Sequence, residues 1–182
     1  MHVLSDNGRA DLAYTLASQK TYPSWGYMVE NGATTIWELW NGNTADPGMN
    51  SQNHVMLVGD LLTWFFENLA GIGADPKAPG FKHILMHPTP VGDLTHVKAT
   101  HDSPYGLIAS EWKAEDGRFE WNITVPPNTS AMIFFPATDA TAVTEGGQPA
   151  RQAAGVEFIA QQADRAVFKI GSGEYRFVSR TH

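Results

Sequence analysis

Cysteine is absent from the 182 residues, which excludes disulfide frameworks, zinc–thiolate sites and thiol nucleophiles together. Basic side chains are also few, since 12 Lys and Arg stand against 19 Asp and Glu and the formal net charge is −7. A nucleic-acid-binding surface needs a basic stripe to neutralise phosphates, so we expect no nucleic-acid partner.

Long hydrophobic runs and targeting signals are missing as well. The most apolar stretch, residues 55–72, is interrupted by Asp60, Glu67 and Asn68, so we expect no membrane-spanning segment. Residues 1–7 contain neither a basic n-region nor an apolar h-region. A chain without cysteine fits any compartment, so the localisation, cytoplasmic or secreted, stays open.

The composition that remains is typical of a folded chain. Apolar residues make up 42% of the sequence and charged residues 17%, which argues against intrinsic disorder. A length of 182 residues is enough for one medium domain, or for one small domain plus part of another.

The first 72 residues have helical periodicity. We expect one helix to begin after Asp6 or Asn7, either of which is a suitable N-cap, and to continue through Lys20. Pro23 ends this helical stretch, because a proline disfavours the helical conformation of the residue before it.

A second helix is expected from about Ser51, as N-cap, to Ala70, with Gly71 as the C′ residue. Apolar side chains also occupy its other faces, so it should be buried on most sides. Its main stripe keeps the i, i+3, i+4, i+7 spacing and consists of Val58, Leu61, Leu62, Phe65 and Leu69.

After residue 79 the apolar period changes to two, which is typical of strands with one wet face. Asp116-Gly117 predicts a two-residue hairpin between two such strands, because type I′ turns need positive φ. Further strands are expected at 83–88, 94–101, 130–135, 141–144, 156–160, 165–170 and 174–179. The predicted fold class is α+β, a helical piece followed by an antiparallel β-sandwich.

The helical piece is too short for its aromatic content. Two helices and one short segment cannot bury all of these side chains. Either the piece lies on the sandwich, or the chain is the tail of something larger. The side chains concerned are Trp25, Trp37, Trp40, Trp64, Phe65 and Phe66.

Residues 22–40 are the richest candidate site, because they combine three Trp, two Tyr and two Glu. Sugar sites are built from aromatic faces and from carboxylates that bind hydroxyls or activate water. Glu38, beside Trp37 and near Trp40, should lose hydration, which raises the pKa of a carboxyl group and makes it a better base. The alternative is that the tryptophans are core residues and that Glu38 caps or pairs locally.

Other chemistry is weakly indicated. His54 should lie in the first turn of the second helix, where exposed N–H groups suit an anion or a sugar oxygen, although a histidine at such a position is more often structural. The seven histidines show no metal-binding spacing, and no phosphate loop or nucleophile elbow occurs, so we expect neither metal nor cofactor. Residues 103–106 are typical of a turn.

These motifs resemble the C-terminal part of bacterial α-L-rhamnosidases of glycoside hydrolase family 78. The resemblance covers roughly residues 4–136 in the right order, and its most specific string is Gly-Ala-Thr-Thr-Ile-Trp-Glu at 32–38. The other segments that carry it are 22–27, the Ser51-x-Asn53-His54 motif, 69–72, 79–83 and 103–112.

The resemblance implies the last helices of an (α/α)₆ catalytic barrel at 1–78 and a C-terminal β-sandwich at 79–182. It further implies cleavage of terminal α-L-rhamnosides with inversion by two carboxylates. On that mapping Glu38 is the general base, whereas His54 and Trp25 contact the substrate.

The sequence departs from the family at the general acid. The acidic motif that carries this residue in the family does not occur in the 182 residues. Loss of general-acid assistance costs on the order of 10²–10⁴-fold in rate. We therefore expect the isolated chain to be inactive or nearly so.

Two other classes of function stay open at this point. One is a carbohydrate-binding or interaction module, with an aromatic platform on one sheet face drawn from Tyr105, Trp112, Phe119, Trp121 and Tyr175. Their alternation with polar residues favours the core instead. The other is an inactive relative that self-associates, or assembles with another chain, through the uncovered side of the second helix.

Overall fold

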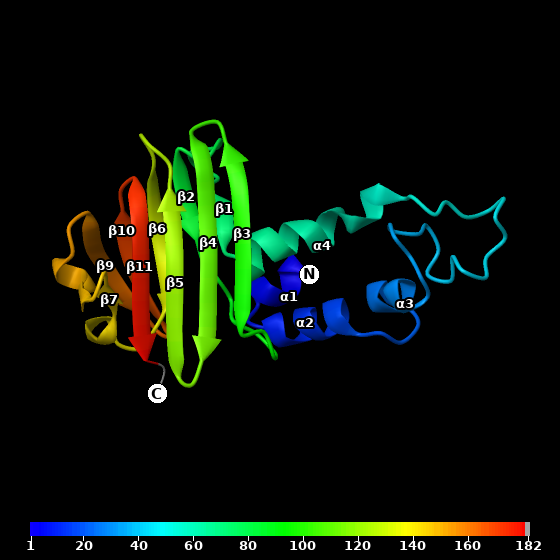
Figure 1. Ribbon diagram of the computed structural model, residues 1–182, viewed down its shortest axis with the longest axis horizontal. Helices are drawn as coiled ribbons and strands as arrows, with labels where there is room; N and C mark the ends of the chain where they lie inside the picture. The colour runs from blue at the N-terminus through cyan, green and yellow to red at the C-terminus, as the bar shows by residue number, and fades with distance from the viewer. Residues whose placement is uncertain (181–182) are drawn as a thin grey trace. The chain divides into compact units, whose positions relative to one another are not determined.

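Figure 1 shows the computed structural model, which describes residues 1–180. The chain divides into two compact units, Met1–Phe65 and Phe66–His182, and each is described by itself. Among the described residues, no helix is both long and apolar enough to cross a membrane.

The first unit is helical. Its elements are α1 (His2–Asp6), α2 (Ala10–Ser18), α3 (Trp25–Glu30), the 3₁₀ helix η1 (Val55–Val58) and α4 (Gly59–Trp64). The buried Trp64 donates its indole N–H to Ser5 Oγ at 2.8 Å, and the N-terminal ammonium pairs with Asp60 at 3.1 Å. These two contacts hold α1 against α4.

The prediction of one helix from Asp6 or Asn7 through Lys20 is wrong at both ends. The structure has two helices in this region, α1 and α2. Gly8, with φ of +74°, follows the C-cap Asn7 of α1 and places the chain in the left-handed conformation that ends a helix. Arg9, and neither Asp6 nor Asn7, is the N-cap of α2, which ends at Ser18.

The second expected helix begins later than predicted. Ser51 is not its N-cap, and His54 is the residue before η1 instead of a member of the first turn. The helical segment continues through α4 into the π-helix η2 (Phe65–Leu69). Gly71 then has φ of +75°, as expected for the residue that ends it.

The second unit is a sandwich of two sheets, as predicted. One sheet has the strand order β1-β2-β6-β10-β9 and the other β3-β4-β5-β11-β7-β8. All pairs are antiparallel except β2 and β6, which run parallel. The strands are β1 (Ile72–Ala74), β2 (His83–Met86), β3 (His96–Ser103), β4 (Gly106–Glu115), β5 (Arg118–Val125), β6 (Ser130–Pro136), β7 (Thr144–Glu145), β8 (Gln148–Pro149), β9 (Val156–Gln162), β10 (Arg165–Ile170) and β11 (Gly173–Arg180).

The sandwich core comes from the alternating residues of both sheets. The hairpin at Asp116-Gly117 is confirmed, with φ of +50° and +69° at the two positions. The prediction that the aromatic residues of the sheets belong to the core is confirmed for three of them. The exposed fractions of Trp112, Phe119 and Trp121 are at most 1%. These three therefore form no exposed platform for a ligand.

Three short elements differ from expectation. Residues 141–144 were expected as a strand, but Asp139 caps the 3₁₀ helix η3 (Ala140–Ala142) by accepting from the Thr141 N–H at 2.8 Å. β1 and β8 were not predicted, because two or three residues are too few to show a period. The domain boundary between residues 78 and 79 stays a prediction, although β1 pairs with β2 inside the sandwich.

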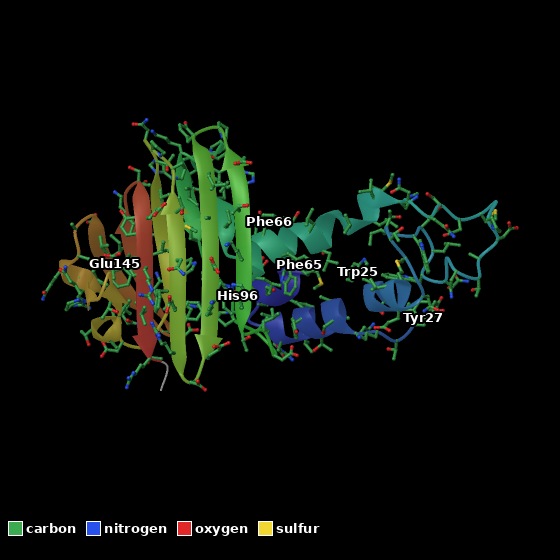
Figure 2. The ribbon with its side chains drawn as sticks, in the orientation of Figure 1. Trp25, Tyr27, Phe65, Phe66, His96 and Glu145 are labelled. Atoms are coloured by element: carbon green, nitrogen blue, oxygen red, sulfur yellow. The ribbon has the colours of Figure 1, made fainter. Side chains whose placement is uncertain are left out.

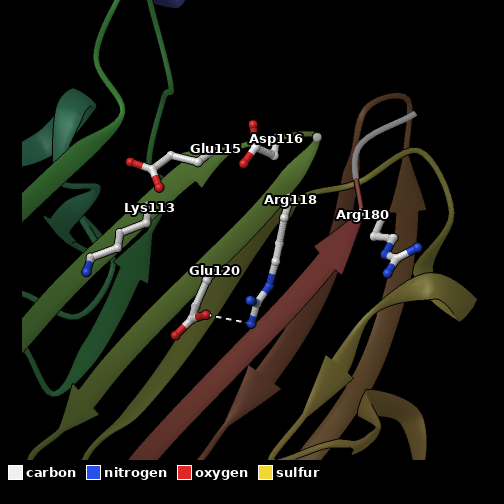
Figure 3. Close-up of a pocket in the computed structure, with 7 residues that line it drawn as sticks. Lys113, Glu115, Asp116, Arg118, Glu120 and Arg180 are labelled. Atoms are coloured by element: carbon white, nitrogen blue, oxygen red, sulfur yellow. Dashed lines mark hydrogen bonds and ion pairs between the residues drawn. The ribbon is translucent and has the colours of Figure 1, made fainter.

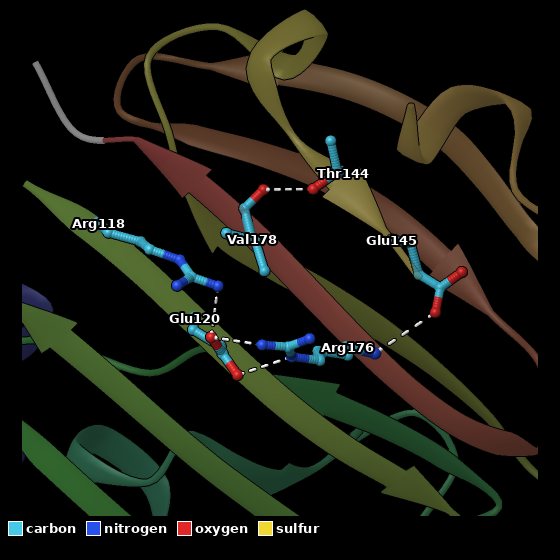
Figure 4. A network of polar contacts seen from close by, with 6 residues as sticks. All are labelled: Arg118, Glu120, Thr144, Glu145, Arg176 and Val178. Carbon is cyan, nitrogen blue, oxygen red and sulfur yellow. Dashed lines mark hydrogen bonds and ion pairs between the residues drawn. The ribbon is translucent and has the colours of Figure 1, made fainter. Parts of the chain in front are cut away.

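The outer face of the six-stranded sheet carries a charged network (Figure 4). Glu120 accepts from Arg176 at 2.7 and 3.0 Å and from Arg118 at 2.7 Å. These two guanidinium groups, Arg176 first, hold the pKa of Glu120 below its usual range. The network ties β5 to β11 and leaves this face polar.

Buried hydrogen bonds hold the end of η2 to the sandwich. Ser110, which is fully buried, donates to the Ala70 carbonyl at 2.6 Å and accepts from the Trp121 indole at 2.9 Å. The Trp112 indole donates to the Leu69 carbonyl at 2.7 Å. The last carbonyls of a helix have no partner within it, so these side chains replace the water that burial removes.

Replacing Ser110 with Ala tests this arrangement. The substitution leaves the Trp121 N–H and the Ala70 carbonyl without their partner, so we expect the free energy of unfolding to fall by about 2–4 kcal/mol. Urea unfolding followed by tryptophan fluorescence measures the change. Ser172→Ala, at an exposed position, is the control, and a loss below about 0.5 kcal/mol in Ser110→Ala contradicts the account.

A second prediction concerns pH. Burial beside Phe134, whose ring centroid lies 5.1 Å away, and the positive charge of Arg165 lower the pKa of His87 to about 4. The unfolded chain takes up this proton first, so the histidine removes stability as the pH falls from about 6.5 to about 4. NMR titration of the imidazole signal tests the value. Arg165→Met should raise the pKa and Arg151→Met should leave it unchanged, whereas an apparent pKa near 6.5 in the unaltered chain contradicts the account.

Candidate active site

The sequence-predicted site lies in the first unit, on α3 and on the long loop 31–54. The α3 helix, which was not predicted, begins at Trp25, because Ser24 is extended and its Oγ accepts from the Tyr27 N–H at 2.9 Å. Figure 2 shows Trp25 and Tyr27 on this helix. Trp25 packs edge-to-face on Trp40, with ring centroids 5.7 Å apart.

The loop is held together by a short stretch of backbone pairing. The Glu38 N–H donates to the Ser51 carbonyl at 2.8 Å, and the His54 N–H donates to the Ile36 carbonyl at 2.7 Å. The Thr35 hydroxyl donates to the Gln52 carbonyl nearby. Residues 35–38 and 51–54, far apart along the loop, therefore lie side by side.

This pairing brings Glu38 and His54 together. The Glu38 Oε2 accepts from the Ser51 N–H at 3.0 Å and lies 3.8 Å from His54 Nδ1. The Glu38 side chain is 41% exposed and that of His54 25% exposed. The hydrogen bond found for this carboxylate among residues 1–180 is the one that Oε2 accepts.

The expectation that neighbouring tryptophans strip water from Glu38 is not met. Trp37 is 5% exposed and packs on Gly42, where an added Cβ would lie 2.7 Å from the indole ring. Trp40 is 39% exposed and contacts Trp25. Trp37 is thus a core residue, as the alternative interpretation held, while the carboxylate of Glu38 stays accessible.

The nearby carboxylates have other partners. Glu30 pairs with Lys20 at 2.6 Å, and Asp46 accepts from the Gly48 N–H at 2.8 Å.

Sequence reasoning missed the residues that hold the loop. Asn50 accepts from the Leu39 N–H at 3.1 Å and donates to the Gly42 carbonyl at 3.5 Å, so it bridges the turn that carries Glu38. Ser51 contributes its backbone to Glu38 instead of capping a helix. The long spacing between the two paired segments gave no periodic signal that could have revealed them.

The other candidate features are elsewhere. Ser103 Oγ donates to the Gly106 carbonyl at 2.7 Å, which confirms the turn at 103–106. A hollow of about 630 Å³ lies at the β4–β5 hairpin and Arg180, and none of the sequence-predicted site residues lines it. Figure 3 shows residues that line this hollow. Within residues 1–180, no three His, Asp or Glu side chains gather closely enough to hold a metal ion.

Two family models match the chain. Residues 1–69 match the bacterial alpha-L-rhamnosidase 6 hairpin glycosidase domain, and residues 71–149 match the bacterial alpha-L-rhamnosidase C-terminal domain. Helices followed by a sandwich, with these matches, place the chain in the six-hairpin class of glycoside hydrolases. Within that class the chain belongs to the bacterial α-L-rhamnosidase family, which confirms both the resemblance and the fold class.

Similar proteins are much longer than this chain. An alpha-L-rhamnosidase of Streptomyces avermitilis is 37% identical over 96% of the chain, which is 16% of the relative. One of Formosa agariphila is 33% identical over 98% of the chain, which is 19% of the relative. The chain therefore spans less than a fifth of the length of these curated relatives.

Solved structures agree in fold. The crystal structure of the Streptomyces avermitilis alpha-L-rhamnosidase in complex with L-rhamnose matches with a TM-score of 0.87 and 35% identity, over 98% of this chain and 17% of that one. The alpha-L-rhamnosidase of Dictyoglumus thermophilum matches with a TM-score of 0.87 and 35% identity, over 99% of this chain and 20% of that one.

Replacing Asn50 with Ala tests the loop geometry in this chain. The substitution removes the acceptor of the Leu39 N–H and frees the turn, so we expect amide hydrogen exchange at Leu39 and Ser51 to become roughly tenfold faster, the effect of about 1.4 kcal/mol. NMR exchange measures it. Asn53→Ala, at an exposed position of the same loop, is the control, and equal effects of the two substitutions contradict the bridging role.

Proposed function

We propose that this chain carries the general-base half of an inverting α-L-rhamnosidase site, with Glu38 as the base. The single observation that supports it most is the orientation of the Glu38 carboxylate. One oxygen accepts from the Ser51 N–H, and the side chain is 41% exposed, so water can reach the carboxylate. A carboxylate that is held by a hydrogen bond and reached by solvent is suited to take a proton from water, because its position is fixed before the reaction.

His54 and Trp25 are proposed to bind the sugar. His54 lies 3.8 Å from the carboxylate, so a hydroxyl or the attacking water can contact both residues. Trp25 is half-buried and packs on Trp40, which belongs to the same loop as Glu38. The Trp25 ring therefore supplies an aromatic surface next to this loop. Aromatic faces cover the C–H face of a sugar ring, which fits a terminal rhamnose. The proposed substrates are therefore rhamnose-containing glycosides or oligosaccharides, and the Streptomyces relative was crystallised with L-rhamnose.

The proton donor is proposed to come from outside these residues. An inverting pair stands roughly 6.5–9.5 Å apart to admit water. The acidic motif that carries the general acid in the resembling family does not occur in the 182 residues. We therefore propose that the chain alone is inactive, or nearly so.

Hydrolysis of 4-nitrophenyl α-L-rhamnoside tests the roles. We would join this chain to the preceding part of the Streptomyces avermitilis relative, in place of the relative's own matching segment, and compare it with the chain alone. We expect turnover by the joined protein and none by the chain. Glu38→Gln should lower kcat of the joined protein by about 10²–10⁴-fold.

Glu30→Gln is the matched control, because Glu30 is a carboxylate of the same unit that pairs with Lys20. It should leave kcat within about threefold. Full activity in Glu38→Gln contradicts the base assignment. Turnover by the chain alone that disappears in Glu38→Gln contradicts the need for an external proton donor.

A further inference from the structure

A groove crosses the outer face of the six-stranded sheet. Along β4 and β5 the buried side chains, such as Trp112 and Trp121, belong to the core, so the residues that alternate with them face outward. Outward-facing residues of β3, β4, β5 and β11, which are neighbours in the sheet, border a hollow of about 530 Å³ (Figure 1). This volume lies within the usual range of ligand sites. We call the hollow the outer groove.

The strand register arranges the residues of the outer groove in two rows that run across the four strands. The first row holds long polar side chains, whereas the middle of the second row holds the short side chains of Ala109 and Thr124. The sheet surface is therefore lower along the second row, beside the longer side chains of the first. The first row consists of Lys98, Glu111, Asn122 and Arg176, and the second of Thr100, Ala109, Thr124 and Glu174.

Ion pairs within the protein hold the charged side chains of the first row. Lys98 Nζ lies 3.3 Å from one carboxylate oxygen of Glu111, and His96 Nε2 lies 3.1 Å from the other. These two partners, His96 first, hold the pKa of Glu111 below its usual range. Arg176 donates to Glu120 at 2.7 and 3.0 Å (Figure 4). The charges of this row are thus fixed in position and compensated inside the protein.

The remaining groups of the groove are neutral. Asn122 lies between Glu111 and Arg176, and its half-buried carboxamide brings two donors and one acceptor. Thr124 adds a hydroxyl, and Leu107, which is 46% exposed, adds an apolar wall. Neutral hydrogen-bonding groups beside an apolar side chain match a sugar ring, which carries hydroxyls on its rim and C–H groups on its faces.

Charge and sheet topology argue against other classes of ligand. Two cations, Lys98 and Arg176, and three carboxylates, those of Glu111, Glu145 and Glu174, line the groove. This balance does not favour nucleic acids or acidic polysaccharides, because their own negative charges would face an excess of carboxylates. A peptide cannot bind here as an added strand, since β4 and β5 each have a paired strand on both sides.

We propose that the outer groove binds a neutral oligosaccharide. The carboxamide of Asn122 and the hydroxyl of Thr124 bind its hydroxyl groups, and Leu107 contacts a ring face. Membership of a glycosidase family favours a sugar over other neutral ligands. Glu38 and His54 do not line this groove, so the binding is a second function of the chain and does not rest on the proposed general base.

NMR titration of the ¹⁵N-labelled chain tests the proposal. The neutral probes are rutinose, xylohexaose and mannohexaose, and the charged counterpart is hexagalacturonate at matched ionic strength. Each is added to about 10 mM, which fills about nine-tenths of a site whose Kd is about 1 mM. We expect at least one neutral probe to shift the amide signals of Ala109, Asn122 and Thr124. No shift with any neutral probe, or tighter binding of hexagalacturonate, overturns the proposal.

Two substitutions locate the binding site. Asn122→Ala removes the carboxamide and Ala109→Trp fills the groove, so each should raise the Kd of the bound sugar by about tenfold or more. Lys113→Ala, on the outer face of β4 but outside the groove, is the control and should leave the Kd within about twofold. Thermal unfolding of each variant separates lost binding from lost folding. Equal effects of the three substitutions overturn the proposal. Shifts confined to residues 22–54 also overturn it, because the sugar then binds at the candidate active site instead.

Discussion

The hydrogen bond from the Ser51 N–H to the Glu38 carboxylate is the interaction on which the candidate site depends. It exists because residues 35–38 and 51–54 pair through their backbones, and Asn50 keeps the turn between them closed. These hydrogen bonds fix the position of the Glu38 carboxylate, although the loop that carries it contains no helix or strand. A carboxylate held in this way, with a side chain that is 41% exposed, is suited to the base catalysis proposed for Glu38.

The two units differ in how far their polar and apolar side chains are buried. In the sandwich, Trp121 donates to Ser110, while Ser110 and Trp112 donate to the carbonyls of Ala70 and Leu69, so these buried polar groups have partners within the protein. In the helical unit, apolar side chains such as Val55 and Met56 remain in solvent. The core of the sandwich is therefore closed, while the helical unit leaves large apolar side chains exposed.

The sequence predicted the strongly periodic parts best. The prediction was correct for β4 and β5 and for the positive φ angles of Asp116-Gly117. A strand with one solvent-exposed face shows an alternating pattern, and a type I′ turn has a typical residue pair, so both can be recognised from neighbouring residues. Gly8 divided the first helix without disturbing its apolar stripe, so periodicity missed the break. Glu38 and His54 were proposed from a motif, but their contact arises from pairing across the 31–54 loop, which no local pattern encodes.

The most direct test of the account is the configuration of the sugar first released by the protein that joins this chain to the preceding part of the Streptomyces relative. If Glu38 activates water on the face opposite the leaving group, ¹H NMR during the first minutes of hydrolysis shows β-L-rhamnose before mutarotation. Initial release of α-L-rhamnose would mean retention of configuration. That result would contradict a general base at Glu38.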